Sequence, residues 1–290
     1  MDFEKVPSSV EELEKIIQPE SEIVTMADAV VQLKAQRGER DYFPVGYELF
    51  DEAMAGGVAF GDFVVIGGRP GEGKTTLAQN FSFHLAKLML PQLWFSYEMD
   101  LQEIWDKFKV MGINEDFLSY VPLQLVSGQI DWVEKRILEG VLKHSVRVII
   151  IDHLGFLAPK ATGTSAERNY AVYLTQIAAQ LKELARQYGV IIFLLAHTRK
   201  TKDELELEDF AFTSGLQQYA DFAFMIERER ERRKMVLGQD TGDRFTPFSK
   251  ISLAKNRRTG RGKFIRVMLN NGHFRQVLNT PQDAPNIYDF

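Results

Sequence analysis

Short apolar runs alternate with longer amphipathic stretches through the middle of the chain. The apolar runs are rich in Val, Ile and Phe and cover residues 62–68, 92–98, 122–126, 146–152 and 189–197. Stretches with apolar residues at helical spacing separate them, at 74–90, 100–111, 130–143 and 167–188. Strands that alternate with helices predict a parallel sheet, and nearly continuous apolar strands are typical of a sheet that is buried on both faces.

The pattern changes after residue 220, where four further runs are separated by polar turns. These runs cover residues 221–229, 248–256, 263–270 and 273–278. Asn270, Asn271 and Gly272 form a strong hairpin signal between the last two runs. We therefore expect these strands to extend the sheet with antiparallel pairing. The predicted fold class is α/β, with a largely parallel sheet between helices and antiparallel C-terminal strands.

Both ends of the chain differ from this pattern. Residues 10–17 and 26–36 have apolar positions at helical spacing, with Pro19 between them, and neither segment is long enough to be a domain. The last twelve residues are rich in Pro and Asn. We predict an N-terminal appendage with a linker helix over 1–45, one main domain over 46–278 and a flexible tail over 279–290.

Composition excludes several classes of protein. The 290 residues are 45% hydrophobic and 26% charged, which is an ordinary globular mix. Because the chain has no cysteine, disulfide frameworks, thiolate zinc sites and cysteine nucleophiles are excluded. A net charge of −5 means that any binding of nucleic acid needs a local basic patch. No run reaches the roughly 18–20 apolar residues of a membrane helix, and the acidic start is not a secretory signal, so we expect a soluble cytoplasmic protein without membrane contact.

The strongest chemical signal is GRPGEGKT at 68–75, which fits the P-loop pattern G-x-x-x-x-G-K-[ST] between a predicted strand and a predicted helix. Glycines let backbone N–H groups form an anion-binding nest at a helix N-terminus. Lys74 can reach the phosphates, and the Thr75 hydroxyl can bind Mg²⁺. A glycine turn that matches by chance is the alternative. We predict ATP and Mg²⁺ as cofactors and a nucleotide site made of Gly68, Arg69, Pro70, Gly71, Glu72, Gly73, Lys74, Thr75 and Thr76.

Three polar residues at predicted strand ends are candidates for the rest of the site. Asp152 can hold the metal together with Thr75, or it opens a loop or caps a helix. Glu98 can orient the attacking water, or it is a first-turn acid of the next helix. His197 can sense the γ-phosphate, or it is structural.

These motifs stand in the order of a known family. From about Asp41 to Val277, the chain resembles the RecA-like motor domain of DnaB-type replicative helicases, a group that includes phage primase-helicases and Twinkle. The matching segments are GRPGEGKT, FSYEM, IIIDHLGFL, LLAHTRK and ISLAKNRRTGRG. The resemblance implies that Glu98 is the catalytic glutamate, Asp152 the Walker B aspartate and His197 the γ-phosphate contact. A histidine at this last position makes the chain more similar to the Twinkle and phage branch.

The resemblance also implies an assembly. ATP would bind between the subunits of a ring, usually a hexamer, and Lys255 and Arg257 would reach the neighbour's nucleotide as fingers. On the residues alone, KNRRTGRGK is equally a solvated basic hairpin or a patch for phosphate backbones. MADAVVQLKAQ is the candidate linker helix that packs on the adjacent subunit, and we expect a motor that lacks the family's N-terminal helicase or primase domain.

The implied function is a DNA helicase that moves 5′ to 3′ on single-stranded DNA, with primase or other replication proteins as partners and a phage or plasmid as a compatible origin. Two loops would contact the DNA through Lys160, Arg168, Arg199, Lys200, Lys202, Thr213, Ser214 and Gly215. The second loop then turns acidic over 203–209, and acids oppose phosphates. The alternatives are therefore a RecA-like ATPase that remodels, loads or switches proteins without unwinding, and a recombination-type filament protein.

Overall fold

The computed structural model describes residues 24–37, 40–114, 117–157, 166–198, 214–231 and 244–277. The chain divides into two units between Arg40 and Asp41. The described part of the first unit contains helix α2 (Met26–Arg37), where the sequence predicts a linker helix. The Thr25 hydroxyl accepts a hydrogen bond from the Asp28 backbone N–H at 3.1 Å, which caps the helix start. The predicted helix at 10–17 lies outside the described residues.

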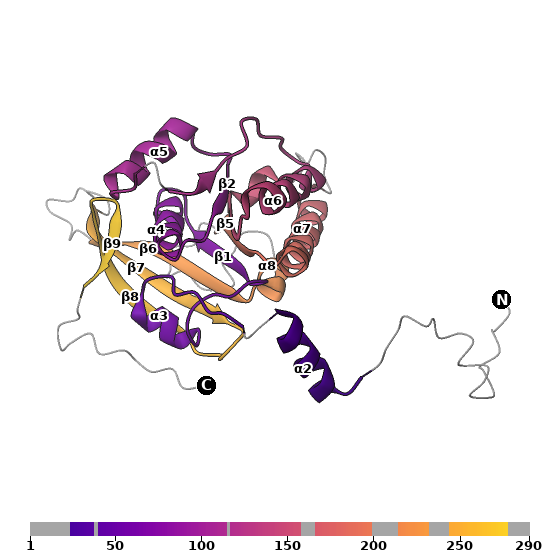
Figure 1. The fold of residues 1–290 in the computed structure, drawn as a ribbon. Helices are drawn as coiled ribbons and strands as arrows, with labels where there is room; N and C mark the ends of the chain where they lie inside the picture. Colours follow the sequence, from indigo (N-terminus) through magenta and orange to yellow (C-terminus); the bar gives the residue numbers. More distant parts are fainter. Residues whose placement is uncertain are drawn as a thin grey trace, which may run out of the picture. The chain divides into compact units, whose positions relative to one another are not determined.

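A mixed sheet forms the centre of the second unit, and its described strands run in the order β3-β2-β4-β5-β1-β6-β7-β8-β9 (Figure 1). The parallel strands are β3 (Ser119–Tyr120), β2 (Gln92–Ser96), β4 (Val148–Asp152), β5 (Ile191–His197), β1 (Phe63–Gly68) and β6 (Phe222–Glu231). The antiparallel strands are β7 (Arg244–Asn256), β8 (Lys263–Asn270) and β9 (His273–Gln276). The predicted fold class is confirmed. The prediction for the first late strand was wrong, because β6 pairs in parallel with β1 and the antiparallel part begins at β7.

Helices cover both faces of the sheet, as Figure 1 shows. They are α3 (Glu48–Ala53), α4 (Lys74–Lys87), α5 (Leu101–Val110), α6 (Ile130–His144), α7 (Ala166–Tyr188) and α8 (Ser214–Tyr219), with a short 3₁₀ helix η1 (Leu154–Phe156). Along β1, Val64 and Ile66 join the core under α3, α4 and α5, and Phe63 and Val65 join the core under α6 and α7. Every β1 residue is buried, which explains why the strand shows no polar alternation. Within the described residues, no helix is long and apolar enough to cross a membrane.

The predicted strand at 122–126 was wrong. The edge strand is the two-residue β3, which pairs with β2 through Ser119 and Tyr120. Pro122 has no N–H to donate to a neighbouring strand, and Leu123 is 92% exposed. The apolar residues of this run therefore do not mark a buried strand.

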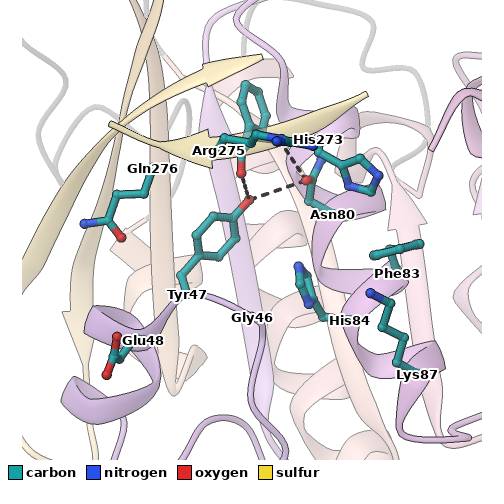
Figure 2. A pocket seen from close by; sticks show the side chains of 11 residues that line it. Gly46, Tyr47, Glu48, Asn80, Phe83, His84, Lys87, His273, Arg275 and Gln276 are labelled. Carbon is teal, nitrogen blue, oxygen red and sulfur yellow. Dashed lines mark hydrogen bonds between the residues drawn. The ribbon is translucent and has the colours of Figure 1, made fainter. Parts of the chain in front are cut away.

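The β8–β9 hairpin is confirmed, and it is fastened to the helix that follows the P-loop. Its turn has positive φ at Asn271 (47°) and Gly272 (76°), as a two-residue hairpin of this kind requires. Asn80 of α4 donates to the Gly272 carbonyl at 2.9 Å and accepts from the Phe274 N–H at 2.9 Å. The Tyr47 hydroxyl completes the network with a 3.2 Å bond to the Phe274 carbonyl, at a pocket of about 480 Å³ (Figure 2). This network positions α4, and with it the P-loop.

Candidate functional site

The P-loop connects β1, which ends at Gly68, to α4, which begins at Lys74. Gly71 (φ 79°) and Gly73 (φ 103°) adopt left-handed conformations that glycine tolerates best. A Cβ at Gly68 would lie 2.8 Å from the Ile226 carbonyl oxygen, so this position also requires glycine. The loop therefore turns sharply and directs the first N–H groups of α4 toward the end of the sheet, where an anion can bind.

Two side chains of the loop are held by β6. Arg69 forms an ion pair with Glu227 at 2.6 Å. Glu72, which is 2% exposed, pairs with Arg230 at 2.8 Å and accepts a hydrogen bond from the Arg228 N–H. Because both side chains form ion pairs with β6, they stabilise the loop. Only the backbone groups of Arg69 and Glu72 are then available to bind a nucleotide. Pro70 and Gly71 lie exposed at the loop tip, and Thr76 is half-buried on α4.

Lys74 lies buried between the strand ends. Its side-chain nitrogen donates to the Arg69 carbonyl at 3.2 Å and lies 3.0 Å from Nδ1 of His197. Burial lowers the pKa of Lys74, and the negative charges of Glu98 and Asp152 oppose that shift. The structure thus brings the P-loop lysine together with the predicted residues of β4, β5 and the end of β2.

Thr75 and Asp152 meet directly. The Thr75 hydroxyl donates to Oδ2 of Asp152 at 2.7 Å, and Oδ1 of Asp152 is buried and has no partner among the described residues. Burial raises the pKa of Asp152 to about 6, although the bond from Thr75 opposes the shift. A buried carboxylate oxygen with no partner fits a hard cation or its bound water. The donor set therefore fits the Mg²⁺ site that the sequence predicts.

Glu98 lies between two histidines. Its Oε1 is 3.2 Å from Nε2 of His197 and 3.4 Å from Nε2 of His153, and the two rings are perpendicular with centroids 4.3 Å apart. Burial lowers the pKa of both histidines, that of His153 to about 4. His153 is not among the site residues predicted from the sequence. Its one signal was its place directly after Asp152 in IIIDHLGFL.

The same three side chains present ligand atoms within 4.8 Å of one another, a spacing that a metal ion could also bridge. The Lys74 contact argues against this arrangement. If Lys74 donates to Nδ1 of His197, the imidazole proton lies on Nε2, which then faces Glu98 as a donor. The cluster is therefore a hydrogen-bonding site around a carboxylate.

Lys255 and Arg257 lie far from the P-loop of their own chain. Lys255 pairs with Ala223 at the start of β6, and its side chain donates to the Gln217 carbonyl. The neighbouring Phe222 pairs with Val64, four residues before Gly68, which is about 13 Å at ~3.3 Å per strand residue. The predicted fingers thus lie at the edge of the sheet opposite the nucleotide site, and the structure does not bring them together with Lys74.

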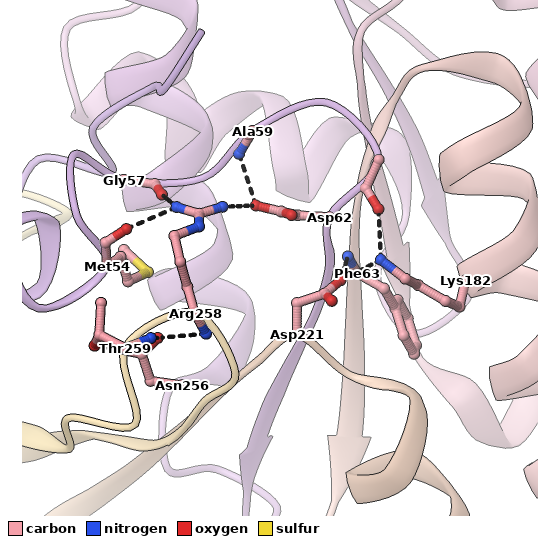
Figure 3. Close-up of polar contacts among 11 residues, drawn as sticks. Met54, Gly57, Ala59, Asp62, Phe63, Lys182, Asp221, Asn256, Arg258 and Thr259 are labelled. Carbon is pink, nitrogen blue, oxygen red and sulfur yellow. Dashed lines mark hydrogen bonds and ion pairs between the residues drawn. The ribbon is translucent and has the colours of Figure 1, made fainter. Parts of the chain in front are cut away.

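The residues before and after Arg257 hold its turn in place through hydrogen bonds (Figure 3). Arg258 donates to the Met54 carbonyl at 2.7 Å and to Oδ2 of Asp62 at 2.7 Å. Asn256 donates to the Ala53 carbonyl at 2.7 Å. Arg257 itself is exposed, and its backbone N–H donates to the Asp221 carbonyl at 2.8 Å. The family resemblance points to Arg257 as the finger, but nothing in KNRRTGRGK indicates that the neighbouring Arg258 is the arginine that pairs with Asp62.

The predicted DNA contacts are not part of this geometry. Lys160, Arg199, Lys200, Lys202 and Thr213 lie outside the described residues. The backbones of Arg168, Ser214 and Gly215 lie in α7 and α8, but the side chains of Arg168 and Ser214 are outside the described part of the structure.

Comparison with known proteins finds a matching family model and related sequences. The model of a family described as AAA domain matches residues 51–203. The chain is 25% identical over 248 residues to the replicative DNA helicase DnaB of Mycoplasma genitalium, which covers 73% of this chain and 52% of that protein. It is 27% identical over 158 residues to the DNA repair protein RadA of Escherichia coli, covering 54% of this chain and 32% of that protein. The chain thus spans about half, or less, of the length of these relatives.

Two solved structures share the fold. One is described as an ATPase domain, with a TM-score of 0.67, 18% identity and coverage of 94% of this chain and all of that one. The other is a DnaB-like replicative helicase studied with primase, with a TM-score of 0.66, 20% identity and coverage of 91% of this chain and 69% of that one. The RecA-like core and the resemblance to DnaB-type motor domains are thereby confirmed.

Proposed function

Because the chain belongs to the AAA domain family, we propose that it is the ATP-hydrolysing motor of a ring-forming, DnaB-like DNA helicase. The observation that carries the proposal is the division of the site between two edges of the sheet. Lys74, Thr75, Asp152, Glu98 and His197 converge at one edge, which makes half of a hydrolytic site. Lys255 and Arg257 lie at the other edge, where a neighbouring subunit could receive them. Such a chain needs a second copy to complete its chemistry.

Within one subunit, the residues divide the work as follows. The P-loop N–H groups and Lys74 bind the phosphates, and Thr75 and Asp152 hold Mg²⁺, which neutralises charge on the phosphate oxygens when it is bound. Glu98 orients and deprotonates the attacking water, since a carboxylate at this edge has access to the γ-phosphate position. His197, 3.0 Å from Lys74, contacts the γ-phosphate.

Between subunits, Arg257 supplies positive charge to the neighbour's γ-phosphate, and Lys255 supports it. Charge from a neighbour makes hydrolysis depend on assembly. We further propose that residues 46–278 form the motor domain and that α2 is the linker helix that packs on the adjacent subunit. Single-stranded DNA passes through a homohexameric ring, and primase or other replication proteins are the partners.

The alternative of a remodelling ATPase without unwinding is not favoured, because replicative helicases are among the relatives.

The test measures ATP turnover with and without single-stranded DNA, and strand displacement on a forked duplex. We expect stimulation by single-stranded DNA, displacement that requires ATP, and rings in negative-stain images with a non-hydrolysable ATP analogue. Duplex DNA without a single-stranded arm is the matched control. Assembled rings that hydrolyse ATP without responding to single-stranded DNA and that do not separate the fork would overturn the helicase proposal.

A further inference from the structure

We infer that His153 is a positioning residue that holds Glu98 in place for hydrolysis. This inference rests on the proposed function, since it concerns the same carboxylate. Nε2 of His153 lies 3.4 Å from Oε1 of Glu98, and Nε2 of His197 lies 3.2 Å from the same oxygen. Catalytic hydrogen bonds are often long until substrate binds, so 3.4 Å is compatible with a bond that tightens during the reaction.

Packing fixes the imidazole of His153. Its ring lies against Phe156 with centroids 5.0 Å apart, and Phe156 stacks on Tyr97, the residue before Glu98, at 5.4 Å and 11°. Gly155 leaves room for the ring, because a Cβ there would lie 2.8 Å from Cε1 of His153. The aromatic stack therefore joins the residue after Asp152 to the residue before Glu98.

The backbone makes the same connection. The Tyr97 N–H donates to the Asp152 carbonyl at 2.7 Å, and the Tyr97 hydroxyl donates to the Val126 carbonyl at 3.1 Å. The ends of β2 and β4 are thus joined by hydrogen bonds as well as by the aromatic stack. His153 is therefore held on the same packed segment as Glu98.

The two histidines differ in what else they contact. His197 is engaged by Lys74 at 3.0 Å, and both of these side chains are assigned to the phosphates in the proposed function. A bound nucleotide competes for Lys74 and His197, since charged hydrogen bonds to phosphate are strong. Glu98 would then lose His197 as a partner. His153 is packed against Phe156 and remains, so the carboxylate keeps its orientation toward the attacking water.

The test compares kcat and KM for ATP in His153→Ala and His153→Gln, each made in the wild-type chain and in Glu98→Gln. Because misplacement of a catalytic group by about 1 Å costs about a hundredfold, we expect His153→Ala to lower kcat by about tenfold to a hundredfold. KM for ATP should change less than about threefold, since binding groups are untouched. His153→Gln places an amide N–H near the position of Nε2 and should recover most of kcat.

The decisive readout is additivity. If His153 acts through the Glu98 carboxylate, His153→Ala should cost little more in the Glu98→Gln background. A full additional loss there, or a loss confined to KM, would overturn the inference. Gly155→Ala, which displaces the ring without changing the imidazole, should lower kcat in the same direction.

His144→Ala is the control, because His144 stacks on Tyr120 at 4.3 Å at the end of α6 and is not part of the site. Thermal unfolding and binding of an ATP analogue show whether each variant is folded. If the wild-type chain itself shows no turnover, the proposed function fails. If the wild type turns over and folded His153→Ala matches its kcat, only the positioning role fails.

Discussion

The side-chain nitrogen of Lys74 lies 3.0 Å from Nδ1 of His197, so the P-loop and the end of β5 are in direct polar contact. The lysine is 5% exposed and lies near two carboxylates, Glu98 and Asp152, whose charges favour its protonated form. The Lys74 ammonium group is thus held at the edge of the sheet toward which the P-loop directs the first N–H groups of α4. This contact joins the lysine proposed to bind phosphates to the histidine at the end of β5.

Lys74→Ala should abolish measurable ATP turnover. The change removes the only side-chain cation that the described P-loop directs at the strand ends, since Arg69 is paired with Glu227. Steady-state phosphate release is the measurement. Lys87→Ala, at the other end of the same helix, is the matched control and should behave like the wild type. Turnover at the wild-type rate in folded Lys74→Ala would refute the assignment of the nucleotide site.

Glu98→Gln should retain ATP binding and lower hydrolysis by about a hundredfold or more. The amide keeps the size of the side chain but loses its ability to take a proton from water, which removes stabilisation of the transition state alone. Binding of a fluorescent ATP analogue and single-turnover hydrolysis separate the two effects. Glu103→Gln, an exposed acid in the first turn of α5, is the control. Normal hydrolysis by Glu98→Gln would mean that another group, such as Asp152, supplies the base.

Arg258→Ala and Arg257→Ala should differ sharply in stability. Arg258 pairs with Asp62, which is 2% exposed, and also donates hydrogen bonds to two backbone carbonyls. Removing one partner of a buried pair costs about 3 kcal/mol, because the remaining charge is left uncompensated. Arg257 is exposed, so its loss should change the free energy of unfolding by less than about 0.5 kcal/mol. Urea denaturation of the two variants is the measurement, and equal stability would contradict the assignment of Arg258 as the arginine that compensates buried Asp62.

Local patterns in the sequence predicted much of the fold. The helices at 74–90, 100–111, 130–143 and 167–188 all form, with ends that differ by a few residues. They were predictable because helical spacing and flanking glycines act over short distances. The closeness of the candidate residues at the strand ends was predictable for a related reason. In a parallel sheet, the ends of successive strands share one edge, so Glu98, Asp152 and His197 had to lie near the P-loop.

Long-range pairing was not predictable in the same way. The position of Lys255 at the far edge follows from the β6–β7 register, which no local pattern encodes. The ion pair of Arg258 depends on a carboxylate 196 positions away in the chain. His153 was missed because its role depends on the aromatic packing around Phe156 and Tyr97, which appears only in three dimensions. The strand predicted at 122–126 does not form, because its apolar composition suggested burial whereas Leu123 is exposed.

The position of Lys255 and Arg257 leads to a prediction about assembly. Because the turn lies at the sheet edge opposite Gly68, Arg257 cannot reach its own P-loop without unfolding β6 and β7. Arg257→Ala should therefore remain folded and lower hydrolysis by about a thousandfold, the scale on which arginines from a neighbouring molecule act. Arg261→Ala, in the same connection between β7 and β8 and also exposed, is the control and should lose little.

Mixing two inactive variants separates action in trans from action in cis. Arg257→Ala subunits keep an intact P-loop, and Lys74→Ala subunits keep an intact finger. Some interfaces of a mixed ring place an intact P-loop beside an intact finger, so ATP turnover should rise above that of either variant alone. Turnover should also pass through a maximum as the mixing ratio varies. Native mass spectrometry must show mixed oligomers in the same samples. Mixed rings without any recovered turnover would mean that Arg257 does not act on a neighbour, and the ring-motor mechanism would then lack the charge that completes its site.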